Sequence, residues 1–181
     1  MDVGIHMLFQ NPGNMTDLAV YDAELEIAKL AEPLGFDSLW CVEHHFTDYT
    51  MCPDVTQFLS YMAGQTSKIK LGTGAVILPW HDPLRVAEEI CLLDYYSKGR
   101  TIFGMGRGLA RIEYDNFRLD MSKSRVQFDE SAEMIITALK TGFAEYDGEV
   151  IKQPRVEIRP RPPYSFEDRI YSVAMSPDSI D

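Results

Sequence analysis

The chain has 181 residues, of which 45% are hydrophobic and 25% charged, a composition typical of a folded globular domain. Its formal net charge of −11 repels phosphate backbones and anionic lipid surfaces, so we expect no nucleic acid partner and no membrane partner. Cys41, Cys52 and Cys91 form no CxxC pair, which argues against a disulfide framework or a cysteine zinc site and favours a cytoplasmic location.

In the first half, short apolar segments alternate with helical patterns. Strands are expected at Val3–Phe9, Phe36–Val42 and Ile69–Leu78. Thr16 or Asp17 caps a helix that runs to about Leu34 and closes at Gly35. Its inward face is expected to hold Leu18, Tyr21, Leu25, Ala28 and Leu30. Pro53 opens a second helix.

The second half continues the alternation. Asp82-Pro83 predicts an N-cap followed by a helix to about Tyr96, which Gly99 ends. A strand follows at Thr101–Met105, then an irregular stretch to Met121, then a long helix from Ser122 or Ser124. Residues 142–168 form an excursion with a hairpin turn and a proline-rich segment. A fifth strand is expected at Arg169–Ala174, and a helix at Ser176.

Alternating apolar strands and helices predict an α/β fold with a parallel sheet covered on both faces. Two architectures fit, an open doubly wound sheet or a (β/α)8 barrel. A barrel typically needs about 250 residues, and the chain supplies about five βα units. We therefore expect a single domain over 1–181, and if the architecture is a barrel, this domain forms its N-terminal part and leaves the barrel incomplete.

In such folds, ligands bind at the carboxyl ends of the strands. Glu43-His44-His45 follows the second strand, and histidine can transfer protons near neutral pH. A hydrogen-bonded structural histidine fits the same position. The pattern HExxH is absent, so we expect no metal site.

Glycines follow the third and fourth strands. Gly72-Thr73-Gly74-Ala75 either leaves room for a flat ligand or allows tight strand packing. Gly104-Met105-Gly106-Arg107-Gly108 could present backbone N–H groups and a guanidinium to a phosphate, but it is not a dinucleotide fingerprint. Arg125 could reach the same phosphate or lie at the surface, and Ser176 could bind an anion or cap a helix. Together these strand ends predict one phosphate-bearing ligand.

The blocks Glu43–Phe46, Leu71–Pro79, Leu92–Arg100 and Gly106–Leu109, taken in order, resemble the bacterial luciferase-like monooxygenases. The resemblance implies a (β/α)8 TIM barrel that binds reduced FMN at its carboxyl face. In that family the flavin reacts with O2 to give a C4a-hydroperoxide, which oxygenates an organic substrate. A small hydrophobic aldehyde, ketone or alkene-like substrate is expected, with a separate flavin reductase and a homo- or heterodimeric assembly as partners.

The resemblance also implies individual roles. His44 matches the catalytic histidine, while Glu43, Ala75 and Val173 would border the isoalloxazine ring. The Gly74–Ala75 bond matches a non-prolyl cis peptide of the family. Cofactor phosphate contacts fall to Arg107, the backbone of Leu109, Arg125 and Ser176. Gly74 and Met175 are further cofactor-binding positions, and Met175 replaces an acidic residue of the family.

Two departures from the light-emitting members lie near these positions. Gly106 stands where their catalytic subunits have a cysteine, and Ala110 where they have a tyrosine, which argues against light emission but not against monooxygenation. Two alternatives remain open. One is an F420-dependent oxidoreductase that transfers hydride on the same barrel, and the other is a non-catalytic flavin-binding subunit.

Overall fold

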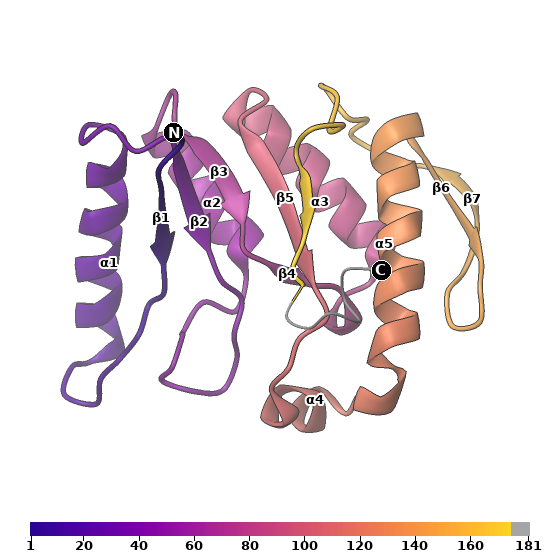
Figure 1. Cartoon of the computed structure of the whole chain (residues 1–181), viewed down its shortest axis with the longest axis horizontal. Coiled ribbons are helices and arrows are strands. Elements are labelled where there is room, and N and C mark those ends of the chain that lie inside the picture. The colour runs from indigo at the N-terminus through magenta and orange to yellow at the C-terminus, as the bar shows by residue number, and fades with distance from the viewer. Residues whose placement is uncertain (175–181) are drawn as a thin grey trace.

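The computed structural model describes residues 1–174, and its centre is a parallel β-sheet (Figure 1). Strands β1 (Gly4–Met7), β2 (Ser38–Cys41), β3 (Lys70–Thr73) and β5 (Thr101–Gly106) pair in this order. Strands β4 (Val76–Ile77) and β8 (Ile170–Ser172) both pair with β5. All five pairings in this sheet are parallel, and within the described residues β1 pairs only with β2 and β8 only with β5. The fold is thus α/β with about five βα units and an unclosed barrel.

Four longer helices connect the strands: α1 (Asp17–Ala31), α2 (Val55–Gln65), α3 (Pro83–Ser97) and α5 (Ser124–Thr141). Their starts follow local chemistry, since Thr16, Asp54 and Asp82 each accept a hydrogen bond from the first-turn backbone. The prediction of Asp82 as N-cap with Pro83 at the first helical position is confirmed. Lys98 and Gly99 adopt positive φ and end α3 as expected.

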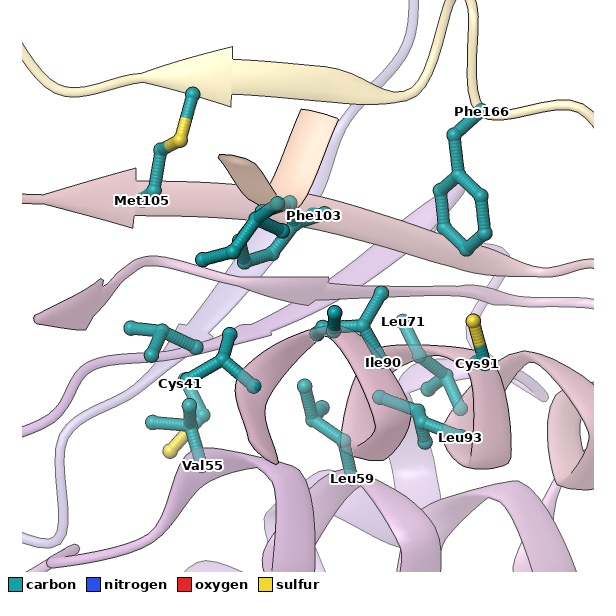
Figure 2. Close-up of a cluster of buried hydrophobic side chains, with 14 of the residues drawn as sticks. Cys41, Val55, Leu59, Leu71, Ile90, Cys91, Leu93, Phe103, Met105 and Phe166 are labelled. Carbon is teal, nitrogen blue, oxygen red and sulfur yellow. The ribbon is translucent and has the colours of Figure 1, made fainter. Parts of the chain in front are cut away.

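The core lies between the sheet and the helices that cover it. Figure 2 shows Leu59 of α2 and Ile90 of α3 directed at the strands, where they meet Leu71 and Phe103. All four side chains are fully buried. This packing ties the helices to the sheet and fixes the positions of the strand ends.

A hairpin made of β6 (Phe143–Asp147) and β7 (Lys152–Glu157) packs beside α5, apart from the parallel sheet (Figure 1). The hairpin expected within 142–168 is confirmed, and its turn covers residues 148–151, between Asp147 and Lys152. Buried Glu130 of α5 holds this turn, because its carboxylate accepts hydrogen bonds from the backbone of Glu149, Val150 and Ile151.

Three expectations were wrong. The inward face of α1 was wrong at Leu18 and Leu30, which are exposed because the smaller Val20, Ala28 and Ala31 take the buried positions. Ala28 was expected there, and Tyr21 packs against the core as expected. The segment 69–78 is not one strand, since it breaks at Gly74–Ala75 and ends in the short 3-10 helix η1 (Leu78–Trp80). The stretch 106–121 contains helix α4 (Arg111–Phe117), and the turn η2 (Met121–Lys123) follows it. The helix expected at Ser176 lies outside the described residues.

Candidate functional site

A cavity of about 240 Å³ lies at the carboxyl ends of β2, β3, β4, β5 and β8. It lies on the side of the sheet where α4 and the loop after β2 are found (Figure 1). Eight residues singled out from the sequence line it: Glu43, His44, Gly74, Ala75, Arg107, Leu109, Arg125 and Val173. The structure therefore brings these eight together, whereas Met175 and Ser176 lie outside the described residues.

A larger hollow, about 620 Å³, lies elsewhere, between the C-terminal end of α5 and residues 161–170. Its charged lining groups, Lys140, Arg161 and Glu167, are exposed, so solvent screens them. The smaller cavity is the candidate site because buried ionisable groups surround it.

His44 is oriented by a buried carboxylate. Its Nδ1 lies 2.9 Å from Oε1 of Glu113, which is 1% exposed and also accepts a hydrogen bond from the backbone N–H of His45 at 2.9 Å. The carboxylate accepts, so Nδ1 donates, and Nε2 is the ring nitrogen that remains to exchange a proton. The sequence reasoning missed Glu113, because it lies on α4, where no helix was expected.

Glu43 occupies a second buried carboxylate position. Its Oε1 lies 3.1 Å from Nε2 of His45 and 2.7 Å from Nε2 of His81, and its Oε2 accepts the backbone N–H of Ile77 at 2.9 Å. Burial opposes the charged form, but the hydrogen bonds from His45, His81 and Ile77 hold the pKa of Glu43 below its usual value. His81 was also missed, since it follows η1 rather than a strand.

Two arginines face the cavity from different elements. Arg107 follows β5 and donates from Nη1 to Ser124 Oγ at 3.3 Å, and Arg125 lies in the first turn of α5. Guanidinium groups at the start of an 18-residue helix suit a phosphate or another anion. The structure does not place Arg125 away from the cavity at the open surface, the other possibility left by the sequence.

The glycines differ in what they do. A side chain at Gly72 would collide with Trp40, and one at Gly104 with the backbone of Thr73, so these two allow tight strand packing. The Gly104 N–H donates to Thr73 Oγ1 at 2.8 Å, so it cannot bind a phosphate as the sequence suggested. Gly106 instead keeps the cavity open, because a Cβ there would approach Ile77, Ala75 and Val173 of the lining.

The cavity floor and one wall are apolar. The floor contains the Gly74–Ala75 peptide bond, which is cis as the resemblance implied. Trp80 lines the wall and packs edge-on against His45 and Tyr114, with ring centroids 5.3 Å and 5.9 Å apart. Its indole Nε1 is buried and meets the distance and angle of a hydrogen bond with no acceptor among the described residues.

A flat small-residue surface and two guanidiniums fit a ligand that has a planar ring and an anionic tail. Over residues 1–174, no group of three or more histidine, cysteine or acidic side chains could hold a metal ion. Within that same range, no helix has both the length and the apolar character needed to cross a bilayer.

These features define an α/β protein of the barrel class, with a cavity that two arginines line at its carboxyl face and with three histidines paired there with two buried carboxylates. The chain belongs to the luciferase-like monooxygenase family, whose model matches residues 1–181. The alkanal monooxygenase alpha chain of Photorhabdus luminescens is 33% identical over all 181 residues of the chain and 50% of that relative. The chain therefore spans about half the length of the curated relatives that it matches.

Solved structures agree with this assignment. The monooxygenase RslO1 from Streptomyces bottropensis superposes with a TM-score of 0.88 at 30% identity, over 99% of this chain and 55% of that one. The coenzyme F420 dependent tetrahydromethanopterin reductase from Methanopyrus kandleri gives 0.71 at 26% identity, over 99% of this chain and 52% of that one. The family thus contains proteins named for both kinds of chemistry.

Proposed function

We propose that the whole protein is an FMN-dependent monooxygenase that uses reduced flavin and O2 to oxygenate a small hydrophobic organic substrate. The observation that carries this proposal is one cavity lined by both Arg107 and His44, with His44 fixed on buried Glu113. A relative named as an alkanal monooxygenase, 33% identical over the whole chain, supports the same chemistry.

Different cavity residues would contact the phosphate and the ring of the cofactor. Arg107 and Arg125 would bind the FMN phosphate, together with the backbone of Leu109. Ser176 stays a prediction for the phosphate and Met175 for the cofactor as a whole. Ala75, Glu43 and Val173 would border the ring, and Gly106 leaves space for it. When bound, reduced FMN would supply the electrons that activate O2.

The protein's chemical part falls to His44. Because the Nδ1–H group of His44 donates to Glu113, Nε2 is the nitrogen that would act as a general base or as a hydrogen-bond donor beside the reacting atoms. The ring of Trp80, which lines the same cavity as His44, would limit water there. Protein groups thus orient, exclude water and move a proton.

The direct test supplies the whole protein with FMN, a separate flavin reductase and ¹⁸O₂, against a panel of aldehydes, ketones and alkenes. We expect one ¹⁸O atom in the product of at least one substrate class, and loss of that product in a His44→Ala variant. Product that carries no ¹⁸O would refute monooxygenation. Mixing the protein with and without candidate second chains would show whether it works as a homo- or heterodimer.

A second candidate is hydride transfer with F420, which the 26% identity to an F420 dependent reductase favours. The same panel under anaerobic conditions with reduced F420 distinguishes the two, because only hydride transfer proceeds without O2. FMN binding with neither oxygen uptake nor turnover would instead identify a non-catalytic flavin-binding subunit.

A further inference from the structure

The Glu43 carboxylate already uses three of its roughly four lone-pair sites in the geometry described. It is 1% exposed, lines the cavity, and uses Oε1 for His45 and His81 and Oε2 for the Ile77 N–H. What it presents to the cavity is therefore its negative charge. In a partly desolvated site a unit charge acts over several ångströms more strongly than in water.

This charge conflicts with the ligand of the proposed function. Reduced flavin loses a ring proton near neutral pH and becomes anionic, whereas the oxidised ring is neutral. A bare Glu43 carboxylate beside the ring would repel the reduced form, and a buried charge without a partner is costly in any case. The cavity therefore needs a positive charge close to Glu43, apart from the arginines assigned to the phosphate.

His81 is the group placed to supply it. Its Nε2 lies 2.7 Å from Glu43 Oε1, closer than His45 at 3.1 Å. Burial disfavours its charged form, but the contact with Glu43 and the charges of Glu43, Glu89 and Asp54 together raise the pKa of His81. Arg85, which lies 3.6 Å from Glu89, is the cation next to these groups.

Local structure holds His81 in place. It follows η1 directly and precedes the N-cap Asp82, and its backbone N–H donates to Leu78 O at 3.1 Å. The preceding residue, Trp80, lines the cavity. The turn η1 therefore connects Trp80 of the cavity wall directly to His81, the partner of Glu43.

We propose that His81 is a positioning residue whose positive charge neutralises Glu43, so that the cavity accepts the anionic reduced ring. The inference rests on the proposed function, and it adds a determinant of which redox state of the cofactor binds. His81 acts through Glu43 and does not itself line the cavity.

The test compares affinities for oxidised and reduced FMN, measured by anaerobic titration at pH 7 in the whole protein. We expect His81→Gln to weaken binding of reduced FMN about tenfold and that of oxidised FMN less than threefold. His81→Lys keeps the positive charge, so its ratio of affinities for reduced and oxidised FMN should equal that of the wild type at pH 7. At pH 8.5 the wild type should lose this preference for reduced FMN, whereas His81→Lys should keep it. With Glu43→Gln present, His81→Gln should have no further effect.

A second measurement needs no cofactor. Imidazole ¹⁵N NMR of the protein without flavin should show His81 protonated at pH 7, and its titration should move to lower pH in Glu43→Gln. Equal weakening of both redox forms in His81→Gln, a Lys variant that behaves like Gln, or a neutral His81 at pH 7 would each overturn the inference. Those outcomes would leave the proposed function standing. If the wild type binds FMN in neither redox form, the proposed function itself is refuted.

Discussion

Nδ1 of His44 lies 2.9 Å from Oε1 of Glu113, although 69 residues separate the two in the sequence. His44 follows β2 and Glu113 lies on α4, so the contact exists only because β2 and β5 deliver their carboxyl ends to the same edge of the sheet. The pair fixes the tautomer of His44, because the Glu113 carboxylate can only accept and Nδ1 must donate.

Replacing Glu113 with Gln should lower the rate of product formation about 10²-fold or more, because an amide can hold His44 in the wrong tautomer. FMN affinity should change less than threefold, since Glu113 does not line the cavity. Steady-state kinetics across pH 5.5–9 and FMN titration measure the two effects. A variant with an unchanged pH profile and rate would show that Glu113 does not act through His44.

Replacing Arg107 with Gln should weaken FMN binding by about 10- to 100-fold, the size of a lost charge-assisted hydrogen bond. Riboflavin, which lacks the phosphate, should bind the variant and the wild type equally. Arg118→Gln is the matched control, because Arg118 is exposed and donates to the nearby Asn116 carbonyl. Equal losses for FMN and riboflavin would place the phosphate elsewhere.

The His81–Glu43 pair should make stability depend on pH. The raised pKa of His81 means that its contribution is complete below the ordinary value of 6.5 and is lost as pH rises through the folded value. The lowered pKa of Glu43 gives a contribution present above 4.5 and lost as pH falls through its folded value. Urea unfolding from pH 5.5 to 8.5 should therefore show a decline in free energy at the alkaline end that is smaller in His81→Gln. Identical slopes would contradict the pairing.

Truncating Leu59 to Ala should reduce the free energy of unfolding by about 2–5 kcal/mol, since the side chain is fully buried between α2 and the sheet. Leu18→Ala should change it by less than about 0.5 kcal/mol, because Leu18 is 72% exposed on α1. Urea denaturation of both variants checks the prediction. A large loss of unfolding free energy in Leu18→Ala would instead indicate that Leu18 faces the core, as the sequence suggested.

Much of the fold was predictable because its signals are local. Asp82-Pro83 starts a helix, Gly99 ends it, and short segments with few charged residues mark the buried strands. The cavity could be predicted as well, because parallel strands bring their carboxyl ends to the same edge of the sheet. Most of the selected ionisable and small residues directly follow those strand ends. Eight of the selected residues meet in one cavity for this reason.

The partners of the histidines could not be predicted in the same way. Glu113 and His81 act through contacts across 69 and 38 residues, and neither follows a strand. An acidic residue between Ile112 and Tyr114 looks like an ordinary surface charge until the position of α4 is known. The face of α1 was wrong for a related reason, because alanine packing against the sheet outweighed the larger leucines.

The account rests on one cavity that binds a planar ring with an anionic tail, and a crystal structure of the whole protein with FMN tests this most directly. We predict the phosphate on the guanidinium groups of Arg107 and Arg125, and the ring against Ala75 with His44 within hydrogen-bonding reach. FMN bound elsewhere, or a phosphate that contacts neither arginine, would contradict the account.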